Sequence, residues 1–427
     1  MNRTKLCAAL VGGMVLSGGA LASADQFHYN NILIGDRAAG MGGAYTAVSD
    51  DPSGMYYTPA GLAYASGRSI SASVNAYTVS NRTYKGTMGD KWTRTSSSLL
   101  PNFFGIVQPV GKFKVGFSYA VPDSTQEDQD QSFYANSAVI NFNNKNDTTL
   151  FGPSAALLLK ENLSVGATLY IHKRSTESIL NATKDNGTIT VNINGTPTIT
   201  PQYQWENSYS EIDEWGLRPM IGVMWAPVDK FSVGASISKT YVLASEILLQ
   251  KTISNNGSFN RPNNSMTTSS EKVDYPYQVT VGAAYFPTPS LLLSADVSYY
   301  SSFSYNLPAY DNSNVLYKKK CSFEAVVNGA VGAEYYLNPA WAVRAGLFTD
   351  FANTPKLQIG KSDQYENIDM IGGSVSVSHF TKNTSLTFGG NYKSDIGNGR
   401  HQVAIGTDVQ PATMSSWSMF VSSSYSY

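Results

Sequence analysis

The chain has 427 residues, of which 14% are charged and 12% aromatic, and its formal net charge is −1. Typical globular proteins carry about 25% charged residues, and a disordered chain would lack the aromatic residues. A net charge near zero provides no basic surface for nucleic acid, so we expect no nucleic-acid partner. With 27 Tyr and 36 Gly, the composition instead indicates an all-β chain.

Residues 1–24 have the pattern of a secretory signal peptide. Arg3 and Lys5 form a basic start, residues 6–16 are apolar, and a run of small residues ends at Ala24. This pattern predicts cleavage after Ala24. The alternative is a membrane anchor, but the apolar run is short and broken by glycine. No later stretch has about 20 uninterrupted apolar residues, so no membrane-spanning helix is expected.

Residues 25–67 show no regular alternation of apolar and polar positions. They are rich in small residues, and Gly and Pro interrupt the pieces that could form helices. A compact segment of this size fits inside the lumen of a barrel of about 14 strands. The alternative is a periplasmic tail, but the segment is neither charged nor repetitive. We therefore expect a small N-terminal hatch that plugs the lumen.

Residues 68–427 alternate apolar and polar positions around six tight turns. After the first turn, Phe113, Val115 and Phe117 occupy every second position. Such alternation places one face of a strand against an apolar environment and the other against a polar one. The six turns lie at 111–112, 160–162, 229–230, 287–290, 338–339 and 382–383.

The connections alternate between these short turns and long polar segments such as 176–212 and 254–273, which we expect to be loops. Short turns on one side and long loops on the other are typical of an outer-membrane β-barrel, with Tyr residues near the strand ends in the interfacial girdles. Since backbone groups in lipid must pair within the protein, the sheet has to close. A first strand at 69–79, six hairpins and a last strand at 417–427 predict a transmembrane antiparallel β-barrel of about 14 strands. A soluble up-and-down barrel is the alternative.

Three stretches of the N-terminal segment resemble the FadL family (FadL/TodX-like) of outer-membrane transporters of long-chain fatty acids and other hydrophobic compounds. They are Gly40-Met41-Gly42-Gly43-Ala44-Tyr45, Asp50-Asp51 and Pro59-Ala60-Gly61-Leu62. The hairpin at 218–235 adds to the resemblance, which covers essentially the whole mature chain. One position departs, because Thr58 stands where the family usually has Asn before Pro-Ala. Thr can also make local hydrogen bonds to the backbone, so we expect the turn to be kept.

The resemblance implies that extracellular loops capture a hydrophobic ligand and pass it to a pocket in the lumen. A rearrangement of the hatch then opens a lateral exit through the barrel wall. A lateral exit agrees with elementary physics, because a hydrophobic solute gains nothing from a water-filled pore. The family resemblance also implies that the protein has no cofactor. The hatch motif then comprises Gly40, Gly42, Gly43, Asp50, Asp51, Thr58, Pro59 and Ala60. We expect Asp50 and Asp51 to cap or anchor the hatch rather than to do chemistry.

The sequence offers no sign of an enzyme or of a metal site. The four His residues are widely separated, and no Ser, His and acidic constellation stands out. The run at Gly40 lacks the rest of a dinucleotide-binding fingerprint. Once Cys7 is removed with the signal peptide, Cys321 is the one thiol left and no internal disulfide can form.

Alternation places several charged residues on the lumenal face of the barrel. Arg218 or Arg344 could pair with a substrate carboxylate, because a guanidinium suits bidentate binding. The alternative, which we favour, is that these residues pair with lumenal acids or tether the hatch. The residues placed on this face are His172, Arg218, Asp296, Glu324, Glu334 and Arg344.

The most apolar stretch near a loop base contains Leu243, Ile247 and Leu248. It could line a surface groove that captures ligand, or it could simply finish a strand. The sequence does not separate the two.

These observations predict a monomeric barrel in the outer membrane of a Gram-negative bacterium, with the lipid bilayer and lipopolysaccharide around it. It is divided into a signal peptide (1–24), a hatch (25–67) and a barrel (68–427). The predicted function is passive uptake of hydrophobic compounds, above all long-chain fatty acids, with aromatic hydrocarbons as a variant. The alternative is a structural or adhesive surface barrel that binds partners through its loops. A general porin is disfavoured by the hatch.

Overall fold

The computed structural model describes residues 27–85, 91–133, 138–193, 196–255, 263–311, 313–361, 364–402 and 408–427. The predicted signal peptide and its cleavage site at Ala24 lie outside these ranges. Within the described ranges, no helix has the length and apolarity needed to cross a membrane.

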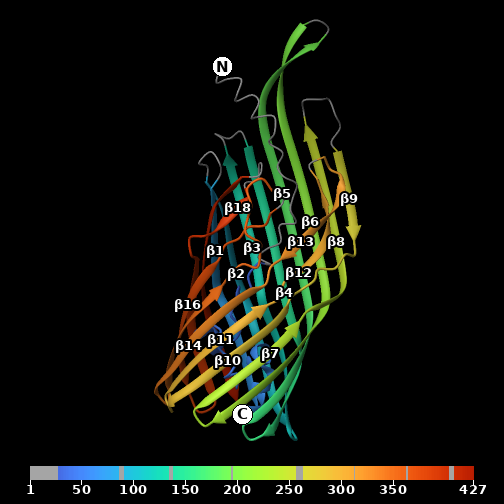
Figure 1. Ribbon diagram of the computed structural model, residues 1–427. Helices are drawn as coiled ribbons and strands as arrows, with labels where there is room; N and C mark the ends of the chain where they lie inside the picture. Colours follow the sequence, from blue (N-terminus) through green and yellow to red (C-terminus); the bar gives the residue numbers. More distant parts are fainter. Residues whose placement is uncertain are drawn as a thin grey trace.

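Fourteen antiparallel strands form a closed, tilted barrel in the described part of the chain (Figure 1). Each strand pairs with the next one around the ring, and β1 and β19 close it through pairs such as Val74 with Val421. The strands are β1 (Ser69–Lys85), β2 (Lys91–Val110), β3 (Phe113–Phe133), β4 (Ala138–Lys160), β5 (Leu163–Ile193), β6 (Thr196–Val228), β7 (Phe231–Lys239), β10 (Tyr277–Thr288), β11 (Leu291–Tyr300), β14 (Val326–Asn338), β15 (Trp341–Asp350), β16 (Met370–Phe380), β17 (Thr384–Asp395) and β19 (Val409–Ser426).

Five further strands in the described part of the chain lie outside this ring. β8 (Tyr241–Asn255) follows β7 and pairs with β6 and with β9 (Asn263–Ser269), while β18 (Arg400–Gln402) pairs with β19. β12 (Phe303–Tyr310) and β13 (Leu316–Phe323) form a separate two-stranded sheet between β11 and β14.

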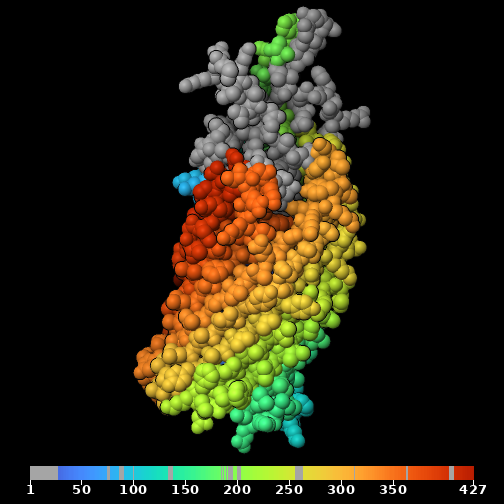
Figure 2. Space-filling view, viewed as in Figure 1, coloured from blue at the N-terminus to red at the C-terminus, as the bar shows by residue number. Residues whose placement is uncertain are grey.

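The period-2 alternation places side chains on two chemically different faces, and all six predicted turns are present. On β15, Trp341, Val343 and Leu347 are exposed on the outside, whereas Ala342, Arg344 and Gly346 are buried. On β10, Tyr277 and Tyr285 are exposed at opposite ends of the strand, roughly 27 Å apart along it. This spacing agrees with aromatic girdles at the two edges of an apolar band about 25 Å tall. Figure 2 shows the wall from β7 to β16 as diagonal bands in sequence order.

The long polar segments are not the loops that we expected. β5 and β6 stay paired from Leu163–Trp225 to Ile193–Thr196, so the segment 176–212 forms a hairpin that projects far beyond the barrel (Figure 1). The described part of 254–273 includes β9, which pairs with β8. The reason is that these segments, although polar, alternate Thr, Ile, Tyr and Trp, which favour strands.

The hatch occupies the lumen, as expected. Its short helices are α2 (Asp36–Gly40), α3 (Gly54–Tyr57) and the 3₁₀ helix η1 (Pro59–Tyr64). α2 contacts β15, β16, β17 and β19, whereas η1 contacts β3, β4, β5 and β6. The hatch therefore reaches different sides of the ring, and its apolar side chains form small cores with the wall. The large side chains among them that are fully buried are those of Ile34, Met41, Tyr45, Met55 and Leu62.

Candidate functional site

The glycine-rich part of the hatch lies directly against the wall. Gly42 and Gly43 have φ values of 68° and 85°, a conformation that favours glycine. On the wall, a Cβ atom at Gly346 of β15 would lie only 2.1 Å from the carbonyl carbon of Met41. Gly40 ends α2 and is buried. Backbone therefore meets backbone here, and only residues without side chains allow this approach.

The Thr58-Pro59-Ala60 turn is present, but not for the reason that we expected. The amide of Gly61 donates to the carbonyl of Thr58 at 3.0 Å, and all three residues of the turn are buried. The predicted side-chain hydrogen bond is wrong, because the Thr58 hydroxyl has no hydrogen-bond partner among the described residues. Proline at the first position of η1 fixes the turn instead.

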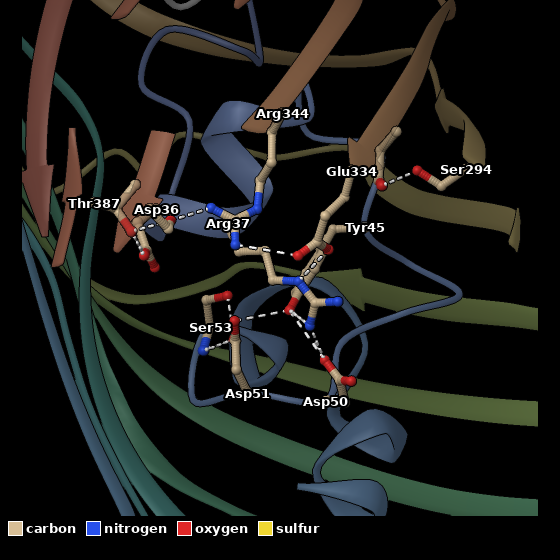
Figure 3. A network of polar contacts seen from close by, with 12 residues as sticks. Asp36, Arg37, Tyr45, Asp50, Asp51, Ser53, Ser294, Glu334, Arg344 and Thr387 are labelled. Carbon is tan, nitrogen blue, oxygen red and sulfur yellow. Dashed lines mark hydrogen bonds and ion pairs between the residues drawn. The ribbon is translucent and has the colours of Figure 1, made fainter. Parts of the chain in front are cut away.

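An ion-pair network centred on Arg37 fastens the hatch to the wall (Figure 3). Arg37 Nε lies 2.7 Å from Glu334 Oε2 on β14, and its Nη1 lies 2.5 Å from Asp50. Arg344 on β15 lies 3.2 Å from the second Glu334 oxygen. Glu334 is fully buried, and Arg344 nearly so. Arg344 therefore pairs with a lumenal acid, as in the alternative that we favoured.

Asp51 organises the turn that leads into α3. Its Oδ1 accepts hydrogen bonds from the amide and the hydroxyl of Ser53 at 2.8 and 2.6 Å, and Oδ2 accepts one from the Tyr45 hydroxyl at 2.7 Å. Burial, and then the negative charge of Asp36, raises the pKa of Asp51 above its ordinary value. These contacts give Asp51 a structural place within the hatch.

A cavity of about 200 Å³ lies between the hatch and the wall. The N-terminal residues 28–33 form one side of it, and β6, β7, β10, β11 and β14 form much of the other. Apolar and aromatic side chains cover a large part of the lining: Tyr29, Ile32, Leu33, Tyr56, Tyr57, Leu150, Val273, Tyr275, Tyr300 and Phe303. The rings of Tyr29 and Tyr300 are stacked, with 3.7 Å between their centroids.

Two of the sequence-predicted substrate residues, Arg218 and His172, line this cavity. Arg218 Nη2 donates to Gln278 Oε1 at 2.7 Å, and its guanidinium lies 5.7 Å from the centre of the Tyr56 ring. Among the described residues, no carboxylate forms an ion pair with Arg218. His172 is buried against Tyr275, and its Nε2 has no hydrogen-bond partner in the described part of the chain. The cavity thus places a cation beside aromatic and apolar surfaces.

The other candidate residues lie elsewhere. Arg344 does not line the cavity, and Glu324 is exposed in the connection between β13 and β14. Leu243 is exposed on β8, so this stretch belongs to a strand that lies outside the barrel ring. Ile247 is fully buried, and Leu248 is partly buried. Alternation predicted the faces of Arg218 and His172 correctly, but it carries no information on height along the barrel or on pairing partners.

An aromatic roof, which the sequence reasoning missed, lies beside the cavity. The β12–β13 hairpin packs on β8 through a buried cluster that shares Val273 with the cavity lining, and Phe303 of the lining packs against this cluster. The cluster consists of Phe27, Ile212, Ile247, Leu249, Val273, Tyr305, Leu307, Cys321 and Phe323. Cys321, the one thiol in the described chain, is buried there with its Sγ 3.1 Å from the Tyr365 hydroxyl.

The pairing of β2 with β3 is interrupted in the middle. Their register runs from Thr95–Asp128 to Ser96–Glu127 and resumes only at Phe103–Ala120. Residues 97–102 and 121–126 therefore do not pair with each other. Pro122 lies in this window and has no N–H to donate. Its carbonyl accepts instead from the amide of Ile32 in the hatch, at 3.2 Å. Irregular backbone at membrane depth is tolerated where it is buried in protein or lines a cavity.

Comparison with known proteins agrees with this architecture. The family described as "Outer membrane protein transport protein (OMPP1/FadL/TodX)" matches residues 14–364. The fold is similar to a FadL homologue of Pseudomonas aeruginosa, with 16% identity, 93% and 98% of the two chains covered and a TM-score of 0.66. It is also similar to the toluene transporters TbuX of Ralstonia pickettii (18%, 93% and 100%, 0.62) and TodX of P. putida (13%, 94% and 99%, 0.68).

No curated protein sequence matches the chain. Solved structures at such low identity show the fold alone, whereas the family match spans most of the sequence. The chain belongs to the OMPP1/FadL/TodX family of outer-membrane proteins that transport hydrophobic compounds.

Proposed function

We propose that this protein takes up long-chain fatty acids passively across the outer membrane. Arg218 carries this proposal, because it is a cation without an ion-paired carboxylate among the described residues. It faces a cavity that aromatic and apolar side chains line together with polar ones, among them Asp123, Asp274 and Asp296. A guanidinium suits a carboxylate, and the apolar lining suits an alkyl chain. His172, whose Nε2 has no hydrogen-bond partner among the described residues, lines the same cavity.

The proposed route out of the cavity is lateral. The cavity lining includes Pro122 and Asp123, which belong to the unpaired window between β2 and β3. A solute that leaves through this window passes into the hydrocarbon of the bilayer without crossing water. The proposal keeps the division into signal peptide (1–24), hatch (25–67) and barrel (68–427), with the hatch as the gate.

Aromatic hydrocarbons are a second candidate substrate class. The stacked Tyr29 and Tyr300 rings, together with Phe303, Tyr56 and Tyr57, give the cavity several aromatic surfaces. An aromatic substrate could pack on these rings in the offset-stacked or edge-to-face arrangements that aromatic pairs favour. The β5–β6 hairpin, which projects beyond the barrel, is the observation that favours an adhesive role instead.

Uptake of labelled oleate and labelled toluene by a deletion strain tests these alternatives. Restoring the wild-type gene should restore oleate uptake. Arg218→Gln should lower it roughly tenfold, the effect of losing a charged hydrogen bond, and leave toluene uptake unchanged. Arg94→Gln is the matched control, because Arg94 is partly buried, donates to Gln129 at 3.1 Å and does not line the cavity.

Each outcome separates two hypotheses. Loss of toluene uptake alone on deletion would favour aromatic hydrocarbons. Equal oleate uptake with Arg218→Gln and Arg94→Gln would contradict the role of Arg218. If deletion changes the uptake of neither compound, transport is excluded and the adhesive alternative is favoured.

A further inference from the structure

The N-terminal strap, defined here as residues 27–33, connects three features of the lumen. At one end, Phe27 belongs to the aromatic roof, and the Asn353 amide donates to the Phe27 carbonyl at 3.0 Å. Residues 28–33 line the cavity. At the other end, residues 31–33 reach the unpaired window between β2 and β3. A shift of the strap would therefore change the cavity and the window together.

Three hydrogen bonds in the described part of the chain hold the window end of the strap to β2 and β3. Asn31 Nδ2 donates to the Asp123 carboxylate at 3.2 Å, and two further bonds join uncharged groups. The amide of Ile32 donates to the Pro122 carbonyl, and Asn102 Nδ2 donates to the Leu33 carbonyl, both at 3.2 Å. The Ile32 side chain packs with Phe103 and Ala120, the pair at which β2–β3 pairing resumes. Residues 31–33 thus lie across the window from inside, and Ile32 takes over one backbone bond that the two strands do not make with each other.

A buried ion pair on another part of the wall holds the middle of the strap. Asp350, at the end of β15, lies 2.7 Å from Lys393 Nζ on β17, and their side chains are 0% and 5% exposed. Asp350 Oδ1 accepts from the amides of Tyr29 and Asn30 at 3.1 and 3.0 Å. Lys393 donates to the Asn30 carbonyl at 3.3 Å and to Asn31 Oδ1 at 3.2 Å. Together the two charges therefore hold three consecutive residues, 29–31, and both of them bond to Asn30.

A buried ion pair such as Asp350–Lys393 contributes little to the net stability of the fold. Desolvation of two charges often outweighs their attraction, so that apolar side chains of similar volume stabilise a fold as well or better. What the pair provides is position, because charged hydrogen bonds fix the turn at residues 29–31 from both sides. The strap residues beyond this turn, Ile32 and Leu33, are those bonded at the window.

We propose that Asp350 and Lys393 form a clamp that keeps the lateral exit closed by holding the strap in the window between β2 and β3. The inference rests on the proposed lateral route and assigns its control to two wall residues, neither of which lines the cavity. A ligand in the cavity pushes against residues 28–33, and the clamp sets the resistance that this push must overcome.

The test measures access to position 32 from the bilayer. Ile32→Cys is introduced together with Cys321→Ala, so that the cysteine at position 32 is the one thiol in the mature chain. The protein is placed in lipid nanodiscs, and its modification by a lipid-soluble maleimide is timed. Lys393→Met removes the clamp charge. Lys251→Met is the matched control, because Lys251 also forms a buried wall ion pair, with Glu206 at 3.2 Å, but contacts no strap residue that the structure describes.

We expect Lys393→Met to raise the rate of maleimide modification at position 32 about tenfold, the effect of losing one charged hydrogen bond. Lys251→Met should leave this rate unchanged. Lys393→Arg should restore the slow rate. Heat-dependent electrophoretic mobility shows whether Lys393→Met folds. If it does not fold, Asp350→Asn serves as the second variant. Equal rates in the Lys393 and Lys251 variants would overturn the clamp. Wild-type protein that transports neither oleate nor toluene would instead refute the proposed function and leave the modification result intact.

Discussion

On the β14–β17 side, hatch and wall touch backbone to backbone and share a buried ion network, whereas on the β2–β3 side single hydrogen bonds and side-chain packing, such as that of Met55 against Gly105 and Gly116, join them. Met41 packs on Gly346, and Arg37 pairs with Glu334, on the first side. Ile32 and Leu33 each make one bond to the wall on the second. The difference indicates which part of the hatch is fixed and which part can move, because local opening occurs where few buried contacts must be lost.

Removing the charge at the centre of the fixed side should have the largest effect. Glu334→Gln leaves Arg37 and Arg344 without their shared carboxylate, and breaking a buried pair costs about 3–5 kcal/mol. Urea unfolding of the detergent-solubilised protein measures this loss. Glu271→Gln is the control, since its pair with Lys318 is exposed and should contribute less than about 1 kcal/mol. Equal losses would show that the fixed side is not held by its charges.

A methyl group at the backbone contact should have the next largest effect. Gly346→Ala places a Cβ 2.1 Å from a hatch backbone atom, so the hatch must shift, and overpacking of this kind costs about 1–3 kcal/mol. At Gly373, on the neighbouring strand, the nearest atom would be a side-chain carbon at 3.4 Å. Gly373→Ala should therefore be almost neutral in the same unfolding measurement. A neutral Gly346→Ala would mean that the contact is loose.

The movable side should respond differently, with little change in stability but a change in release. Asn102→Leu removes the amide that donates to the Leu33 carbonyl and should lower the free energy of unfolding by about 1 kcal/mol. Release of labelled oleate from the protein into nanodisc lipid should become faster. A stability loss as large as that of Glu334→Gln, with unchanged release, would remove the distinction between the two sides.

The pH dependence of Asp51 should give the smallest effect. Because its pKa is raised in the folded state, the unfolded chain loses this proton first as the pH rises, and the fold is destabilised above the unfolded value. The stability of wild type relative to Asp51→Asn should be highest below about pH 4, fall up to the raised pKa and then stay constant. Urea midpoints of both proteins across this range measure the difference. A difference independent of pH would contradict the raised pKa.

The barrel could be predicted because alternation is a local signal, as the turns at 111–112 and 229–230 illustrate. The ends of the long strands could not, because polar segments such as 176–212 carry no apolar face to mark them. The prolines at 101 and 122 were an available signal for the β2–β3 window, since proline within a strand indicates an edge or a bulge.

The site was predicted only in part. Alternation assigned Arg218 and His172 to the lumen, but whether a lumenal Arg is paired depends on residues far away in sequence, such as Glu334 for Arg37. The clamp was missed for the same reason. Asp350 and Lys393 belong to different strands, and both meet a turn that lies more than 300 positions earlier in the chain.

The seam between β1 and β19 has a consequence for the order of assembly. Ser69 pairs with Ser426, so the two strands that complete the ring are synthesised first and last among the fourteen. Contacts of such high contact order form slowly, because a very long stretch of chain must be arranged before they are gained. The hatch precedes β1 in the chain and is covalently joined to it. The barrel therefore closes around a hatch that is already attached to its first strand.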